Sequence, residues 1–383
     1  MAKKNIRKIT GFIHLWLGLI AGLVVFIVSI TGALWAFETE MLDIAYSYRN
    51  VEPQGKAFVL PSQIKAAAQK AFGGKPVKSI CYWGSNKAAE ARAWGEDGQG
   101  NEYSLQAYIN PYTGQMQGIH EGGTFFDAVI DLHTNLMLGD IGGEIVDYAT
   151  LIFLVMVISG IILWWPHNKA RKKSSYKIKW GAPFKRVVYD LHNVPGFYAS
   201  WVLIFIVITG LAWGFEWVND SIYGIASGGG PQQQWAEPES TSANDAKTIV
   251  LNVDDYCYQN AIKQYAKPFS VSEIYYPSGE EASYTVYINP SLKTLHNRST
   301  YYYDQRSGTL LLEESFAKKN GGEKTRSLYY DIHIGKIWGL PGQLLAFFAA
   351  LIAASLPVTG FLIWLGRKTK KVQQRNETIN GMR

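Results

Sequence analysis

Long apolar stretches dominate the pattern of the chain. Four are nearly continuous runs of Leu, Ile, Val, Phe and Ala, and apart from Asp147 they contain no Lys, Arg, Asp or Glu; they are Phe12–Phe37, Val146–Trp165, Ala199–Phe215 and Leu344–Leu365. A helix of about 20 such residues crosses the hydrocarbon core of a bilayer. A surface helix of a soluble protein would carry a polar stripe along one face, and these stretches have none. The pattern therefore predicts four transmembrane helices.

Basic residues indicate which ends of these helices face the cytoplasm. Of the 37 Lys and Arg residues, 18 lie before the first stretch, between the second and third, or after the fourth, where only Asp190 and Glu377 oppose them. Because Lys and Arg accumulate in cytoplasmic loops, we expect both termini and the middle loop to be cytoplasmic. The net charge of +6 follows from this topology. It predicts a lipid membrane as surroundings and no nucleic-acid partner.

The two long segments between the spans have the pattern of small α+β domains. Each combines helix-forming residues with alternating strands, which turn at 111–114 in the first segment and 305–308 in the second. The predicted fold class is an α-helical membrane protein, a four-helix transmembrane bundle, with two α+β domains outside. The expected segments are the N-terminus with the first span (1–38), the first outer domain (39–130), an outer histidine motif with the second span (131–166), a basic loop (167–191), the third span (192–217), the second outer domain (218–330), an outer histidine motif with the fourth span (331–366) and a basic tail (367–383).

The sequence contains an internal repeat. His14, Gly18, Thr31-Gly32 and Trp35 recur 178 positions later, and Asp131, His133, Gly139, Gly160 and Trp164 recur 200 positions later. Both halves start on the cytoplasmic side, so the repeat is expected to be parallel, with its pseudo-twofold axis along the membrane normal.

Four of the seven histidines belong to this repeat. His14 and His192 open the first and third spans near the cytoplasmic face, whereas His133 and His333 precede the second and fourth near the outer face. Neutral imidazole is the commonest metal ligand among side chains, and ionisable groups beside membrane spans are functional candidates. We therefore predict two metal sites, with His14 paired to His192 and His133 paired to His333.

Glycines near the histidines indicate a large, flat ligand. Gly18 and Gly196 follow His14 and His192 by four residues and so lie on the same helix face. A bare backbone at that position would leave room for the edge of a macrocycle. The other span glycines, Gly32, Gly160, Gly210 and Gly360, are better explained by close helix packing in the membrane.

The metal is predicted to be haem iron. The chain has only two cysteines and no Cys-x-x-Cys-His motif, so zinc clusters, iron–sulfur clusters and covalent haem are not expected. Two imidazoles per level fit two non-covalent b-type haems per chain, whose closed axial positions favour electron transfer. Basic residues at the inner face could pair with haem propionates or with anionic lipids; they are Arg7, Lys8, Lys185 and Arg186. Whether Cys81 and Cys257 form a disulfide stays open.

Several motifs resemble a known family. The start "IHLWLGL…TGALWAFE", the motifs "LHTNLMLG" and "DIHIGKIWGLPG", and the hairpins at "YINP" are similar to the PepSY-associated transmembrane family, over about residues 8–370. The resemblance implies two periplasmic PepSY domains in an inner-membrane protein, with haem bound by His14, His133, His192 and His333. It implies reduction of ferric siderophores in the periplasm and release of Fe(II). No Gly-rich nucleotide motif is present, so a separate protein or a membrane quinol is the expected electron donor.

Two alternatives stay open from the sequence. The chain could be a haem b subunit that passes electrons to another periplasmic acceptor, or a membrane-anchored PepSY module that binds or regulates other proteins. If the substrate is a siderophore, it is expected between the outer domains, where Trp83 and Tyr301–Tyr303 could form a wall or could equally be core residues.

Overall fold

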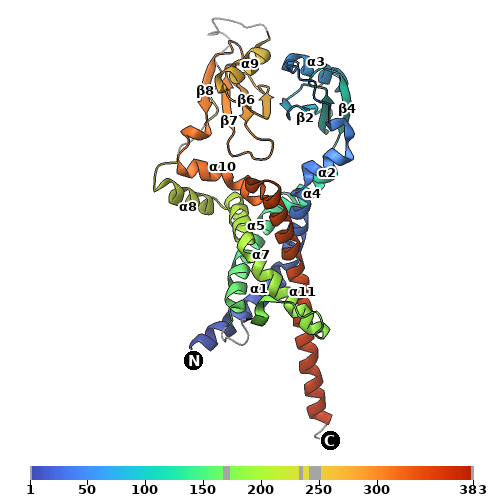
Figure 1. The fold of residues 1–383 in the computed structure, drawn as a ribbon, viewed down its shortest axis with the longest axis vertical. Coiled ribbons are helices and arrows are strands. Elements are labelled where there is room, and N and C mark those ends of the chain that lie inside the picture. Colours follow the sequence, from blue (N-terminus) through green and yellow to red (C-terminus); the bar gives the residue numbers. More distant parts are fainter. Residues whose placement is uncertain (1, 167–172, 233–235, 241–251, 381–383) are drawn as a thin grey trace. The chain divides into compact units, whose positions relative to one another are not determined.

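The computed structural model describes residues 2–166, 173–232, 236–240 and 252–380 (Figure 1). Part of the predicted basic loop (167–172) and the end of the basic tail (381–383) lie outside the described residues. The chain divides into two compact units. Unit 1 contains 1–37, 125–221 and 332–383, and unit 2 contains 38–124 and 222–331.

Unit 1 is built from four long helices that run beside one another (Figure 1). They are α1 (Ala2–Trp35), α5 (Gly139–Trp164), α7 (Phe184–Gly214) and α11 (Leu340–Asn380), and the short helix α4 (Phe125–Asn135) precedes α5. Each long helix contains a segment long and apolar enough to span a membrane: Asn5–Trp35, Gly139–Trp164, Phe184–Gly214 and Leu340–Arg367. The four predicted spans are therefore present as helices.

The helices extend beyond the apolar stretches that predict them. α7 begins at Phe184, directly after Pro183, so His192 lies two turns inside the helix and not at its start. α7 also continues through Pro195, and α11 continues through Pro357. Apolar side chains on all faces make these segments favourable as helices in a membrane, where proline is tolerated more readily than in soluble helices.

The four helices form a ring in which α1 and α7 each contact both α5 and α11. Small side chains are buried at these contacts, including Ala21, Ala33, Ala199 and Ala353. Small residues let helix backbones approach closely, and this is how helices associate where no water drives burial.

Unit 2 contains one antiparallel sheet of eight strands in the order β4-β3-β2-β1-β5-β6-β7-β8. The strands are β1 (Ser79–Tyr82), β2 (Ala89–Glu96), β3 (Glu102–Ile109), β4 (Met116–Glu121), β5 (Val271–Tyr275), β6 (Tyr284–Asn289), β7 (Ser299–Tyr303) and β8 (Leu310–Glu314). The two outer segments are predicted to be separate domains. In the structure β1 pairs with β5, with Ile80 opposite Ile274, and this pairing joins the strands of both segments in one sheet. Both predicted turns form hairpins, and Gly114 and Gly308 have the positive φ that such turns require.

The helices α3 (Pro61–Ala71) and α9 (Val253–Tyr265) pack on this sheet. The other helices of the described chain are α2 (Glu38–Ala45), α8 (Glu216–Ser227) and α10 (Gly321–His333), with short 3-10 helices at Ser47–Arg49, Lys173–Tyr176, Phe316–Lys318 and Lys336–Trp338. The core includes Ile64 from α3, Ala261 from α9 and Ile80 from β1, all fully buried. Unit 2 is therefore held together by apolar residues from both halves of the chain.

The cysteines and the tyrosine run belong to this core. Cys81 and Cys257 are buried free thiols. Burial, followed by the charges of Asp254 and Asp304, raises the pKa of Cys257 to about 12. Tyr301–Tyr303 are also buried in β7. Of the two roles considered for these tyrosines, the structure supports the core role, and they form no open wall for a substrate.

Candidate functional site

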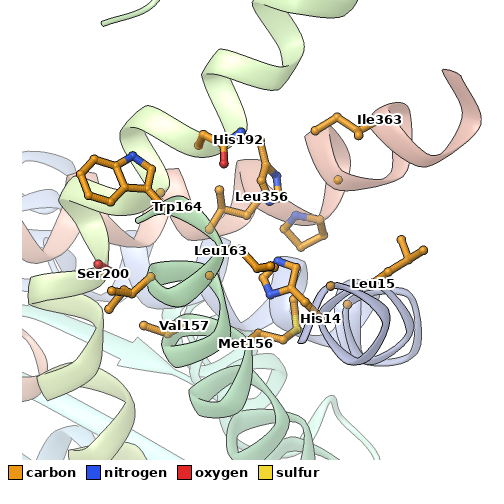
Figure 2. A pocket seen from close by; sticks show the side chains of 18 of the residues that line it. His14, Leu15, Met156, Val157, Leu163, Trp164, His192, Ser200, Leu356 and Ile363 are labelled. Atoms are coloured by element: carbon orange, nitrogen blue, oxygen red, sulfur yellow. The ribbon is translucent and has the colours of Figure 1, made fainter. Parts of the chain in front are cut away.

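The structure brings the four repeated histidines together in two pairs inside unit 1. His14 on α1 faces His192 on α7, with ring centroids 6.3 Å apart. His133 near the end of α4 faces His333, the last residue of α10, with ring centroids 6.1 Å apart. The pairs are those expected from the repeat. Figure 2 shows the side chains of His14 and His192 pointing into one space between the helices.

The spacing in both pairs suits two imidazoles on opposite sides of one metal ion. A metal–nitrogen bond of about 2.0–2.1 Å on each side, plus the distance from nitrogen to ring centre, places such centroids roughly 6 Å apart. Both observed distances agree with this value. The rings of each pair are close to perpendicular, at 89° for the His14 pair and 78° for the His133 pair.

Each histidine ring is held at Nδ1 by a hydroxyl group from a neighbouring long helix. The distances between Nδ1 and the hydroxyl oxygen are 2.8 Å for His14–Ser159, 2.9 Å for His192–Thr359, 3.2 Å for His133–Thr31 and 2.9 Å for His333–Thr209. Because Nδ1 is occupied in every case, Nε2 is the nitrogen left for a ligand. Sequence reasoning missed these four hydroxyl partners.

A glycine follows each of these hydroxyl residues and contacts the same ring. A Cβ atom added to the glycine would lie 2.8 Å from Cε1 of His133 at Gly32, 3.5 Å from His14 at Gly160, 3.4 Å from His333 at Gly210 and 3.3 Å from His192 at Gly360. From the sequence these glycines are expected to serve helix packing. The structure places each of them against an imidazole, so they clear space for the ring itself.

Gly18 and Gly196, the two glycines predicted to clear space for a ligand, line the cavity beside the inner pair. A Cβ atom there would lie 3.0 Å from Cε of Met156 and 3.2 Å from Cδ2 of Leu356, respectively. Both glycines therefore let an apolar side chain of the opposite helix approach the cavity wall.

The cavity beside His14 and His192 has a volume of about 360 Å³, within the range of about 300–1,000 Å³ typical of small-molecule sites. Its wall is mainly apolar, with Met156, Leu356 and Trp164 among the side chains drawn in Figure 2. The indole of Trp164 stacks on Phe197, with ring centroids 3.5 Å apart, and so forms a rigid part of this wall.

Two arginines add positive charge to the apolar cavity. Arg7 on α1 and Arg367 on α11 both line it. Arg7 also donates a hydrogen bond from Nη2 to the carbonyl of Leu163, at 2.5 Å. Of the basic residues predicted to meet propionates, only Arg7 lies at the cavity. Arg186 forms an ion pair with the buried carboxylate of Asp190 at 2.9 Å, and Lys8 and Lys185 are not among the lining residues. Arg367 was missed, although it is the first basic residue after the fourth apolar stretch.

The two outer histidines lie in segments that precede the second and fourth candidate spans, and their hydroxyl partners Thr31 and Thr209 lie inside the first and third spans. The indole of Trp213 packs against His333 with ring centroids 5.1 Å apart. Burial lowers the pKa of His133, and burial together with His133 lowers the pKa of His333 to about 3. Both imidazoles are therefore neutral at physiological pH, which is the form that binds metals.

Comparison with known protein families agrees with the motifs. The model of the PepSY-associated TM region matches residues 12–367, nearly the whole chain. The chain belongs to the PepSY-associated transmembrane family. The resemblance recognised in the sequence is thus confirmed, and with the four apolar helices it identifies a membrane protein. A comparison with curated proteins found no significant match. The part of the chain that matches the PepSY-associated family includes all four histidines and their hydroxyl partners.

Proposed function

We propose that this chain is a di-haem oxidoreductase of the bacterial inner membrane, which carries electrons across the membrane and reduces ferric siderophores in the periplasm. The observation that supports it is the pair of opposed imidazoles at each of two levels. On α1, Thr31, which holds His133, follows His14 by 17 residues, a rise of about 26 Å. The two levels are thus separated by most of a hydrocarbon core of about 30 Å.

The residues at both levels fit b-type haem. At each level two imidazoles lie with their ring centroids about 6 Å apart, and glycines leave room for the rings against the neighbouring helices. At the inner level the cavity adds an apolar wall for a macrocycle, and Arg7 and Arg367 supply charges that suit its carboxylates. Haem held by two imidazoles would supply one-electron transfer.

Residues of this chain would bind each haem and surround it. His14 and His192 would bind at the inner level and His133 and His333 at the outer one. Met156, Leu356 and Trp164 would form the apolar wall around the haem at the inner level. The predicted topology, with both termini and the basic loop in the cytoplasm, places the inner level near an electron donor in the cytoplasm or the membrane and the outer level toward the periplasm.

The ferric siderophore is proposed as substrate because of the coordination chemistry of iron. Siderophores bind Fe(III) through hard oxygen donors, and a one-electron reduction to Fe(II) weakens that binding. The family resemblance implies this substrate, whereas the histidine pairs alone would also serve a haem b subunit for another acceptor. A protein-binding PepSY module would have no use for the paired imidazoles.

The deciding experiment measures haem per chain in the purified full-length protein, together with its reduced-minus-oxidised spectrum. We expect two low-spin b-type haems, one of them lost in His14→Ala and the other in His133→Ala. His120→Ala, a histidine on β4, is the matched control and is expected to keep both. Protein that contains no haem after growth with ample iron would refute the oxidoreductase.

The substrate is tested in a second step. Ferric siderophore added to the dithionite-reduced protein, after removal of excess reductant, should reoxidise the haems while a ferrous chelator traps Fe(II). Haems that stay reduced would favour the alternative acceptor.

A further inference from the structure

Each hydroxyl group beside a histidine donates its proton to a backbone carbonyl of its own helix. Each lies on a helix and bonds back to a carbonyl of its own preceding turn: Ser159 to Met156 at 3.1 Å, Thr359 to Ser355 at 2.8 Å, Thr31 to Ile27 at 2.8 Å and Thr209 to Ile206 at 2.8 Å. A hydroxyl has one proton and can accept two further bonds. Toward the histidine, the hydroxyl oxygen must therefore accept, and Nδ1 must donate.

A backbone carbonyl in the same position supports this assignment. Nδ1 of His133 lies 2.9 Å from the carbonyl oxygen of Val28, three residues before Thr31. For the other three rings the carbonyls at the same position are those of Met156, Leu356 and Ile206, which lie beside His14, His192 and His333, respectively. A carbonyl oxygen can only accept, so His133 carries its proton on Nδ1 and keeps the Nε2 lone pair free. The other three rings are held by hydroxyl groups in the same way and are assigned the same tautomer.

We infer that the four hydroxyl–glycine dipeptides are positioning elements that fix the Nδ1–H tautomer of each ligand histidine and lower the reduction potential of the iron it binds. They are Thr31-Gly32, Ser159-Gly160, Thr209-Gly210 and Thr359-Gly360. The inference rests on the proposed function and assigns these residues a role within it. The hydroxyl orients the ring from the Nδ1 side while the glycine leaves Cε1 room to lie against the helix.

The effect on potential follows from the direction of the hydrogen bond. An imidazole that donates from Nδ1 is a more basic ligand at Nε2. A more basic ligand stabilises Fe(III) relative to Fe(II), and hydrogen bonds of this kind are among the ways in which a protein sets haem potentials. Replacing threonine by the similarly shaped valine removes one acceptor but leaves the carbonyl, so the tautomer and the ligand should persist while the potential rises.

The outer level offers an internal comparison. His333 lies 2.9 Å from the Thr209 hydroxyl, whereas His133 lies 3.2 Å from the Thr31 hydroxyl and closer, at 2.9 Å, to the Val28 carbonyl. The carbonyl therefore takes the larger share of the His133 proton. Thr209→Val should raise the outer potential more than Thr31→Val does.

The test is a redox titration of both haems in the full-length protein. We expect Thr209→Val to shift the outer equilibrium toward Fe(II) by about tenfold, or about 59 mV for one electron, with the inner haem unchanged. Thr209→Ser, which keeps the hydroxyl, should restore the wild-type potential. Thr150→Val is the matched control, because the Thr150 hydroxyl makes the same back-bond, to Val146 at 2.7 Å, and in the described part of the chain bonds to none of the four rings.

Two results would overturn the inference while leaving the di-haem function intact. One is an outer potential that is the same in Thr209→Val and in wild type, or that moves equally in Thr150→Val. The other is a histidine 15N spectrum of the haem-free full-length protein that places the His333 proton on Nε2, with the signal assigned by its loss in His333→Ala. A protein without haem would instead refute the proposed function, and the 15N spectrum would still test the tautomer.

Discussion

Adding one methyl group at Gly32 should selectively weaken the binding of the haem that we propose for the outer level. A Cβ atom at Gly32 would lie 2.8 Å from Cε1 and 3.3 Å from Nδ1 of His133. Ordinary contact begins near 3.4 Å, so in Gly32→Ala the ring of His133 must move by roughly 0.6 Å. Overpacking of this kind costs about 1–3 kcal/mol, which corresponds to a loss of about 5- to 150-fold in haem affinity at 1.4 kcal/mol per tenfold.

The same substitution at Gly210 is the matched control. There the Cβ atom would lie 3.4 Å from Cε1 of His333, which is ordinary contact. Alanine is favoured over glycine inside a helix by about 0.8–1.0 kcal/mol, so neither variant should unfold. Any loss of haem affinity in Gly32→Ala would therefore come from displacement of the histidine ring and not from unfolding of the helix.

The assay is the rate of haem transfer to apomyoglobin, followed separately for the two haems by their spectra. Gly32→Ala should release the outer haem faster than wild type by a factor within the range above, Gly210→Ala should resemble wild type, and the inner haem should be unaffected in both. Equal behaviour of the two variants, or faster release from Gly210→Ala, would show that ring clearance does not control the site.

Three further predictions concern other parts of the chain. His14→Ala should remove the inner haem and leave the outer spectrum unchanged; loss of both haems would contradict two separate levels. Gln343, which is buried and donates to the Ala36 carbonyl at 2.5 Å, stabilises the bundle; Gln343→Leu should lower the free energy of unfolding by about 1–3 kcal/mol, measured in detergent. Cys81 and Cys257 have raised pKa values because they are buried, so the thiolate is scarce at pH 8; iodoacetamide should label neither thiol until the protein is unfolded, and labelling of the folded protein would refute this.

The membrane helices and the histidine pairs could be predicted because each leaves a signal along the chain. Nearly uncharged apolar stretches have few explanations other than a membrane span. The offsets of 178 and 200 residues then match His14 with His192 and His133 with His333. In a parallel repeat, matching positions lie at the same depth in the membrane, so depth follows from the sequence alone.

The partners of the histidines could not be predicted in the same way. Threonine and glycine in a membrane helix serve helix packing as readily as they serve a ligand. Whether Thr31-Gly32 faces His133 depends on where α4 packs against α1, which no local pattern states. The pairing of β1 with β5 could not be predicted either, because strand propensity does not specify the partner strand. Ile80 lies almost two hundred residues from Ile274 in the chain.

The hydrogen bonds to the histidines cross within each half of the chain. In the first half, α1 contains His14 and also Thr31, which hydrogen-bonds to His133. Ser159 on α5 hydrogen-bonds to His14. In the second half α7 and α11 are related in the same way through His192 and His333. Each half therefore supplies one positioned imidazole at each level, and a pair forms only when the halves meet. A metal that needs two axial imidazoles can bind at neither level of a single half, so haem binding and the assembly of the four-helix ring should depend on each other.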